Sequence, residues 1–251
     1  MSLIFYKILS ALGIMVLTII SGLVPLRLAL KHKRLFAYSD AFASGIFLSA
    51  SLLHLLPDAT NGFSASYPNF HYPFAQLICV ITFMILLLLE RSVILYGAYH
   101  KPNGHNLAPL LLALVISVHS VVEGAAIGIN SSLAGMSVIL LAVLAHKSSE
   151  GIALSCNLHR YNIEFKSIVK IILLFSLTSP LGIFLAGTSG HFIAANTEKL
   201  SEIVLDAVAA GTFLYLGTVH IIEKDKKFED VAEIISIVLG ITLMGLVAIY
   251  T

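Results

Sequence analysis

The sequence predicts an all-α integral membrane protein with eight transmembrane helices, an inverted repeat and both termini extracytoplasmic. Of the 251 residues, 58% are hydrophobic and 12% are charged, whereas soluble domains carry about 25% charged residues. Apolar runs of about 20 residues, the length that spans the hydrocarbon core, recur along the chain. The apolar content excludes disorder, the two cysteines exclude a disulfide scaffold, and 15 Lys and Arg against 14 Asp and Glu exclude a nucleic-acid binder.

Eight apolar runs, each bounded by charged or turn residues, define the predicted spans. They are residues 8–26, 41–56, 74–96, 107–129, 135–156, 168–186, 203–222 and 231–250. The third is the least regular, because Glu90 and Arg91 interrupt its end. The connections are short, and the longest runs from about Asp58 to Pro73. Residues 1–251 are therefore expected to form a single transmembrane domain.

The basic residues predict the orientation of these spans. Twelve of the 15 Lys and Arg residues lie at the end of, or just after, spans one, three, five and seven. Short connections rich in Lys and Arg stay on the cytosolic side of a membrane, so both termini are expected outside. The protein is therefore expected to be a multi-pass protein of the cell membrane, either an inner or a plasma membrane.

A short polar pattern occurs in both spans four and five. His119-Ser-Val-Val-Glu123-Gly recurs as His146-Lys-Ser-Ser-Glu150-Gly, and each histidine lies near the middle of its span. Residues four apart share one face of a helix, so each span presents an imidazole beside a carboxylate. Two nitrogen and two oxygen donors suit a divalent ion such as Zn²⁺. The glycine after each glutamate is expected to let the two spans approach closely.

A second repeat joins spans two and seven. Gly45-Ile-Phe-Leu, with His54 nine residues after the glycine, matches Gly211-Thr-Phe-Leu, with His220 nine residues after. The two spans run in opposite directions, so the repeat has inverted topology, which is typical of transporters. His54 is expected near the outer face and His220 near the inner face.

Simpler interpretations of these polar residues stay open. A single buried His or Glu is more often a satisfied structural group than a ligand, and a proton relay is a second alternative for spans four and five. The outer pair His54 and Asp58, and the inner pair His220 and Glu223, lie at membrane interfaces, where polar residues are common. In span six, Pro180 predicts a kink that is either a simple bend or a hinge.

These motifs resemble the ZIP (Zrt-, Irt-like protein) family of divalent-metal transporters over essentially the whole chain. The similar segments are HSVVEGAAIG at 119–128, HKSSEG at 146–151, HLLPDA at 54–59, SPLG at 179–182 and AGTFLY at 210–215. The resemblance implies that His119, Glu123, His146 and Glu150 form the primary transport site. It also implies that His54 lines the entrance and His220 the release path, and that spans 1, 4, 5 and 6 slide against spans 2, 3, 7 and 8 as an elevator.

The chain departs from the family pattern at the position of a second metal. Members with two adjacent metals have amide or acidic side chains where this chain has Ser120, Lys147 and Ser179. A lysine ammonium beside Glu123 and Glu150 would take the place of the second cation. We therefore expect one tightly held metal.

Zinc uptake into the cytosol is the function that the sequence favours. The ion is expected to enter past Asp58 and His54 and to leave past His220 and Glu223, as substrate rather than cofactor. The same ligands also accept Fe²⁺, Mn²⁺, Co²⁺ or Cd²⁺, so a broader importer stays open. The rivals are a membrane-embedded zinc hydrolase and a proton-coupled carrier of an organic solute, although no enzyme is expected. A homodimer would be unsurprising for the family.

Overall fold

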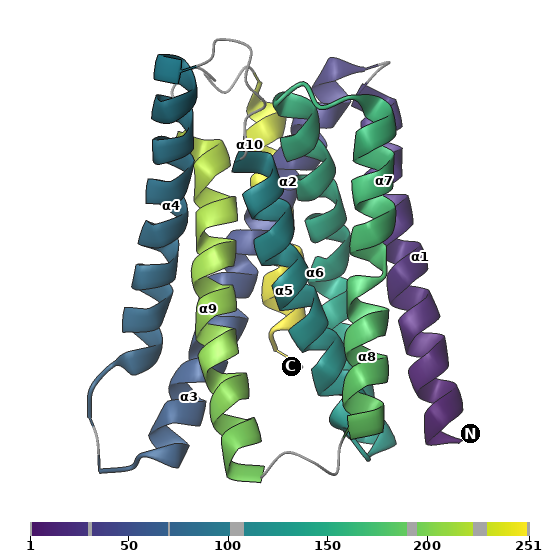
Figure 1. Ribbon diagram of the computed structural model, residues 1–251, viewed down its shortest axis with the longest axis vertical. Helices are drawn as coiled ribbons and strands as arrows, with labels where there is room; N and C mark the ends of the chain where they lie inside the picture. Colours follow the sequence, from purple (N-terminus) through teal and green to yellow (C-terminus); the bar gives the residue numbers. More distant parts are fainter. Residues whose placement is uncertain are drawn as a thin grey trace.

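The computed structural model describes residues 2–29, 32–69, 71–100, 108–189, 195–222 and 230–249, and every regular element within them is helical (Figure 1). The elements in chain order are α1 (Leu3–Ala29), α2 (Lys33–Ala50), the π-helical turn η1 (Ser51–Leu55), α3 (Leu56–Ser66), α4 (Phe74–His100), α5 (Ala108–Ile129), α6 (Leu133–Arg160), α7 (Phe165–Ser176), α8 (Thr178–Ser189), α9 (Ala195–Ile222) and α10 (Val231–Val247).

The described helices have the length and composition of membrane helices. Five segments are long and apolar enough to cross a bilayer, namely Leu3–Leu28, Arg34–Ser66, Phe74–Ser92, Leu133–Arg160 and Phe165–Thr188. Shorter apolar helices cover Ala113–Ile129, Ile203–Thr218 and Val231–Val247, within the predicted spans four, seven and eight. The all-helical membrane class therefore agrees with the structure, while the count of eight spans stays a prediction.

The predicted loop that begins at Asp58 is wrong, because the helix continues to Ser66. Pro57 has no N–H to donate to the carbonyl four residues earlier, which normally ends or kinks a helix. Here the π-helical turn η1 precedes the proline, and the N–H of Leu56 bonds to the carbonyl of Ser51, five residues earlier. The chain therefore stays helical on both sides of the proline. The hydropathy pattern located the end of the apolar run but not the end of the helix.

The predicted disturbance in span six is present as a helix break. Helix α7 ends at Ser176 and α8 begins at Thr178, two residues before Pro180. At the junction, the N–H of Leu177 bonds to the carbonyl of Leu174 at 3.2 Å, and the Thr178 hydroxyl donates to the carbonyl of Phe175 at 2.7 Å. These local bonds satisfy carbonyls that an interrupted helix would otherwise leave exposed.

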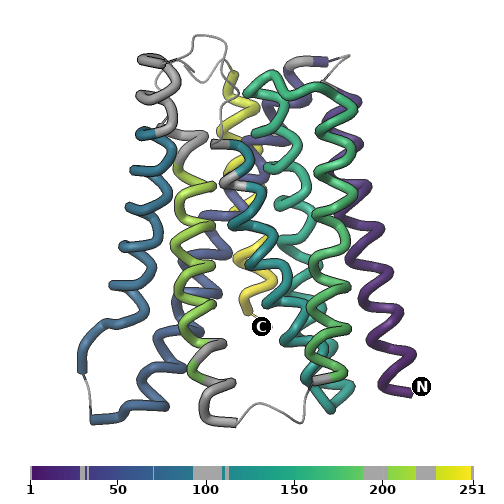
Figure 2. The backbone as a smooth tube through the Cα atoms, in the orientation of Figure 1, coloured from purple at the N-terminus to yellow at the C-terminus, as the bar shows by residue number. Residues whose placement is uncertain are grey.

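The helices pack into two groups by their contacts. In the backbone trace, α3, α4 and α9 lie on the left of the view and α1, α7 and α8 on the right (Figure 2). Helices α5, α6, α7 and α8 gather with α1 in one group, and α2, α3, α4, α9 and α10 form the other. The first group contains the predicted spans 1, 4, 5 and 6, and the second contains spans 2, 3, 7 and 8. This is the division that the family resemblance implies. The groups meet mainly along α2, which contacts both α1 and α6.

The glycines of the repeated motif pack differently from the prediction. A Cβ on Gly124 would meet the backbone carbonyl of Ser179, and one on Gly151 would meet the hydroxyl of Ser21. The expectation that these glycines bring spans four and five together is therefore wrong. Gly124 lets α5 approach α8, and Gly151 lets α6 approach α1.

The α5–α8 contact is reciprocal, since a Cβ on Gly182 of α8 would meet the backbone carbonyl of Val121 and lie 2.9 Å from the N atom of Ala125. Backbone atoms cannot rotate away, so we expect Gly182→Ala to lower the free energy of unfolding by about 1–3 kcal/mol through overpacking. Gly13→Ala is the matched control, because no atom lies within 4 Å of its added Cβ. Thermal unfolding in detergent measures both, and equal midpoints would contradict the prediction.

Candidate metal centre

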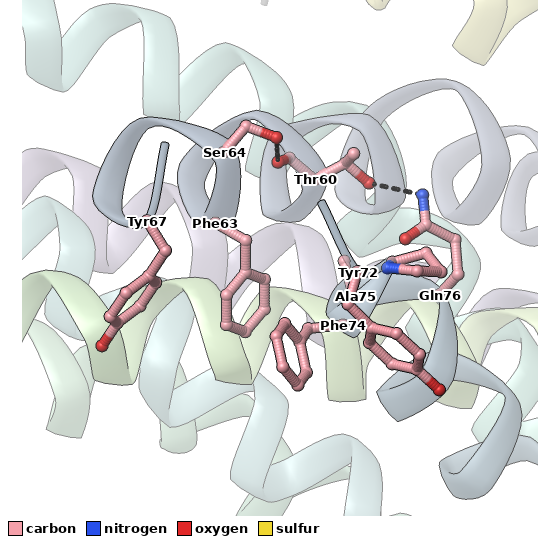
Figure 3. A pocket seen from close by; sticks show the side chains of 9 residues that line it. Thr60, Phe63, Ser64, Tyr67, Tyr72, Phe74, Ala75 and Gln76 are labelled. Carbon is pink, nitrogen blue, oxygen red and sulfur yellow. Dashed lines mark hydrogen bonds between the residues drawn. The ribbon is translucent and has the colours of Figure 1, made fainter. Parts of the chain in front are cut away.

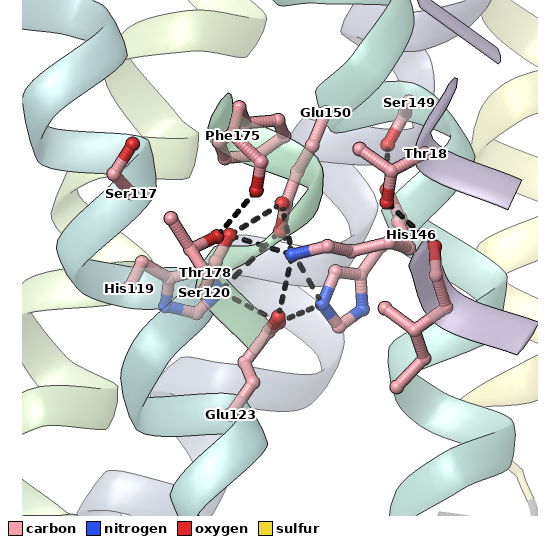
Figure 4. A network of polar contacts seen from close by, with 12 residues as sticks. Thr18, Ser117, His119, Ser120, Glu123, His146, Ser149, Glu150, Phe175 and Thr178 are labelled. Carbon is pink, nitrogen blue, oxygen red and sulfur yellow. Dashed lines mark hydrogen bonds and ion pairs between the residues drawn. The ribbon is translucent and has the colours of Figure 1, made fainter. Parts of the chain in front are cut away.

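Helices α5 and α6 bring the four residues of the repeated motif together. His119 and Glu123 come from α5, and His146 and Glu150 come from α6 (Figure 4). One potential ligand atom of each residue lies within 4.8 Å of the others. Glu150 is fully buried, His146 is 2% exposed, and His119 and Glu123 are each 9% exposed. The spacing of four residues places each imidazole beside the carboxylate of its own helix, as the sequence predicts.

The two imidazoles direct the same nitrogen toward the same pair of oxygens. His119 Nε2 lies 2.8 Å from Glu123 Oε1 and 3.7 Å from Glu150 Oε1. His146 Nε2 also contacts Glu123 Oε1 and lies 3.8 Å from Glu150 Oε1. Two nitrogens and two oxygens therefore surround one point.

Glu150 Oε1 is buried and accepts no hydrogen bond within the described part of the chain. An unpaired buried carboxylate oxygen is costly, because it has lost its water without gaining a donor. A cation bound between the four side chains would supply that oxygen with a partner.

Lys147 occupies the opposite side of the two carboxylates. Its ammonium donates to Glu150 Oε2 at 2.6 Å and to Glu123 Oε2 at 3.2 Å. A third hydrogen bond, of 2.6 Å, goes to the hydroxyl of Ser120, which itself donates to Glu150 Oε2 at 3.0 Å. Each carboxylate thus presents Oε1 to the histidines and Oε2 to the lysine.

The surroundings of Lys147 explain how a charged side chain is tolerated at 1% exposure. An ammonium has three N–H groups to satisfy, and the three oxygens described above satisfy them. The nitrogen also lies 5.1 Å from the ring centroid of Phe175 on α7, a distance suited to a cation–π interaction. The ammonium offsets one of the two negative charges that the carboxylates carry when both are ionised.

Ser179, the third residue at the expected position of a second metal, does not join the network of Lys147 and Ser120. The hydroxyl of Ser179 is buried and has no hydrogen-bond partner among the described residues, so it does not bond to Lys147. The Ser179 backbone carbonyl lies against Gly124, where α8 meets α5. Ser120 therefore joins the lysine network and Ser179 does not.

The predicted entrance residues are not part of the four-residue cluster. His54 of η1 and Asp58 of α3 form a pair, with His54 Nδ1 3.1 Å from Asp58 Oδ2. The His54 side chain is 13% exposed and that of Asp58 is 46% exposed. Of the predicted release residues, His220 belongs to α9 but its side chain is outside the described set, and Glu223 lies outside the described residues.

A small hollow lies between α3 and the start of α4 (Figure 3). Gln76 extends into this region and donates to the Thr60 hydroxyl at 3.0 Å, beside the rings of Phe63, Tyr72 and Phe74. The volume of about 30 Å³ has room for one water molecule. None of the predicted site residues lines it, so its size and lining favour a structural role.

Sequence reasoning missed two aromatic residues at the site. Phe213 of α9 contacts both histidine rings, and Phe175 of α7 lies beside Lys147. Phe213 belongs to the Gly-x-Phe-Leu repeat of spans two and seven, which was the available signal. The repeat itself did not indicate that this phenylalanine faces the histidines of another helix pair.

A family model and similar curated proteins point to the same family. A family model described as ZIP zinc transporter matches residues 4–106 and 97–248. The chain is 26% identical to zinc transporter ZIP1 of Danio rerio, over 95% of this chain and 96% of that protein. It is also 26% identical to zinc transporter ZIP2 of Mus musculus, over 97% of each chain. Protein zntD of Dictyostelium discoideum is 36% identical over 59% of this chain and 22% of its own length.

The lysine network predicts a measurable coupling between charged residues. Lys147→Met would leave two carboxylates buried without their cation, and we expect a loss of about 3–5 kcal/mol in the free energy of unfolding of the metal-free protein. The double variant Lys147→Met/Glu150→Gln should recover part of that loss, because one of the unpaired charges is removed. Unfolding in detergent with a chelator, as a double-mutant cycle, tests this. Additive losses would show that the two side chains do not interact.

Proposed function

Because the chain belongs to the ZIP zinc transporter family, we propose that it carries divalent metal ions across a membrane, with Zn²⁺ as its main substrate. The observation that carries the proposal is the cluster of His119, Glu123, His146 and Glu150, whose ligand atoms lie within 4.8 Å of one another. Two relatives that are named as zinc transporters, and that this chain matches over nearly their whole length, support it. The direction we propose is uptake into the cytosol.

The proposed ion site uses both Nε2 atoms and both Oε1 atoms. Borderline nitrogen donors together with carboxylate oxygens, in a group of four, suit Zn²⁺ in tetrahedral coordination. The Oε2 atoms are engaged by Lys147, which leaves one oxygen of each glutamate for a metal. We therefore propose a single ion at this position, with Lys147 in place of a second cation.

The proposed transport domain comprises residues 1–251, with eight spans in an inverted repeat and both termini outside the cytosol. The two helix groups support an elevator mechanism, because His119 and His146 both belong to the group of α1 and α5–α8. In this mechanism that group carries the ion past α2, α3, α4, α9 and α10. The membrane we propose is the cell membrane, and a homodimer stays a prediction.

The proposed path runs through the predicted residues at the two mouths. Asp58, which is nearly half exposed, and the more buried His54 provide an oxygen and a nitrogen donor before the central site. His220 and Glu223 would provide the same donor types on the release side. An ion would thus exchange its water for protein ligands in steps.

A broader importer of Fe²⁺, Mn²⁺ or Cd²⁺ is the alternative within the family, because two histidines and two carboxylates accept these ions as well. The relatives ZIP1 and ZIP2 are named as zinc transporters, which argues against a zinc hydrolase.

Uptake of radiolabelled Zn²⁺ into proteoliposomes tests the carrier and its site. We expect saturable uptake by the wild type and its loss in Glu150→Ala, since that variant removes an oxygen donor. Glu233→Ala is the matched control, because Glu233 is also a buried glutamate but lies on α10, outside the four-residue cluster. Competition by Fe²⁺, Mn²⁺ and Cd²⁺ ranks the substrates. Correctly inserted protein that transports no divalent ion would overturn the proposal.

Metal stoichiometry tests the role proposed for Lys147. We expect one Zn²⁺ per chain in the purified wild type, measured by calorimetric titration. Lys147→Asp should raise this number toward two, because a carboxylate replaces the ammonium. Two tightly bound ions in the wild type would contradict this role.

Zinc affinity should also depend on pH. It should be lower at about pH 5.5 than at about pH 7.5, because protons compete with the metal for the imidazole nitrogens. Calorimetric titration at the two pH values measures the change, and an unchanged affinity would indicate that the histidines are not ligands.

A further inference from the structure

Phe213 connects α9 to both histidines of the proposed ion site. Its ring centroid lies 4.7 Å from that of His119 and 5.5 Å from that of His146, at interplanar angles of 70° in both cases. These are edge-to-face contacts, the favourable arrangement for aromatic rings at such distances. Phe213 is fully buried, and it belongs to the helix group that contributes none of the four ligands.

A second phenylalanine packs against Phe213. The ring of Phe47 on α2 lies 4.9 Å from that of Phe213, and Phe47 is 1% exposed. Both side chains belong to a core cluster that also contains Ala43, Ala50 and Ala210. Phe213 is therefore part of a close-packed core cluster and not a side chain free in a cavity.

One of the two histidines lacks a polar partner at its second ring nitrogen among the described residues. A metal-binding histidine usually donates its other ring N–H to a carboxylate or carbonyl, which sets the orientation of the ring. His146 Nδ1 is buried and has no hydrogen-bond partner among the described residues. No polar contact therefore fixes the rotation of the His146 ring from that nitrogen.

We propose that Phe213 is a positioning residue for the ion site and contributes to its selectivity. Through its edge-to-face contacts with the two imidazoles, its ring holds both Nε2 atoms toward the carboxylate oxygens of Glu123 and Glu150. This inference rests on the proposed function. A site with two fixed nitrogen donors favours ions that accept imidazole in tetrahedral geometry, such as Zn²⁺ and Co²⁺, over Mn²⁺, which prefers oxygen ligands.

The test compares Phe213→Leu with the matched control Phe47→Leu. Both changes remove a ring from the same buried cluster, but only Phe213 is in ring contact with the histidines. Two readouts are used on each full-length variant. One is the visible absorption spectrum of Co²⁺ bound to purified protein, which reports the coordination geometry. The other is uptake of Zn²⁺ and Mn²⁺ into proteoliposomes, which gives KM for each ion.

For Phe213→Leu we expect weaker tetrahedral Co²⁺ bands and a roughly tenfold higher KM for Zn²⁺, the lower end of what loss of an orienting partner causes at metal sites. KM for Mn²⁺ should change less, so the preference for Zn²⁺ falls. Phe47→Leu should keep the wild-type spectrum and preference. Phe213→Tyr retains the ring and should restore both, and if Phe213→Leu does not fold, Phe213→Met replaces it.

The outcomes separate this inference from the proposed function. A wild-type spectrum and a wild-type ion preference in folded Phe213→Leu would overturn the positioning role alone. Equal effects of Phe213→Leu and Phe47→Leu would also overturn it, since they would reflect general loosening of the core. A wild type that binds no Co²⁺ and transports no Zn²⁺ would overturn the proposed function and this inference with it.

Discussion

The division of two carboxylates between two imidazoles and one ammonium is the interaction on which the centre of this protein depends. Glu123 and Glu150 each direct one oxygen toward the histidines and the other toward Lys147. Charged groups are costly in the middle of a membrane protein unless each finds a partner. Lys147 supplies a permanent partner on one side, and the proposed metal ion is the partner on the other. Because the two oxygens of each carboxylate have different partners, the same two glutamates can stabilise the structure through Oε2 and serve as proposed metal ligands through Oε1.

Close helix packing holds this cluster at a defined place. Gly124 and Gly151 follow the two glutamates directly, and each allows a neighbouring helix to approach the backbone, α8 in the first case and α1 in the second. The same device recurs in the other helix group, where a Cβ on Gly45 would meet the carbonyl of Ile237 and one on Gly240 that of Phe42. Small residues at helix contacts are the usual means of association in membranes, where lipid removes the hydrophobic driving force. The four-residue cluster is thus carried by two helices, each of which packs closely against a further helix.

The two helix groups meet mainly along α2, and specific side-chain contacts join them. At one end of α6, Arg160 forms an ion pair of 2.6 Å with Asp40 of α2, and the neighbouring His159 packs its ring against Phe36 at 5.3 Å. Near the centre, Phe213 meets the histidines. Side chains from α2 and α9 therefore contact the group of α1 and α5–α8 at its centre and at one end. The surroundings of the four-residue cluster thus include a residue of the other helix group, Phe213. For the proposed elevator, these are the contacts that a sliding motion must change.

The sequence by itself determined the membrane class, the two helices that bear the four-residue cluster and the pairing of His119 with Glu123 and of His146 with Glu150. These follow from apolar run length and from a spacing of four residues, which are properties of single helices. It also indicated the break before Pro180, because a proline disrupts its own helix. The tertiary structure decided which surfaces meet: the glycines face α8 and α1, Ser120 but not Ser179 reaches Lys147, and Phe213 faces the histidines. It likewise carried the helix past Pro57 to Ser66 through a π-helical turn. Periodicity specifies the face on which a side chain lies, but the helix opposite that face is selected by the packing of all helices together.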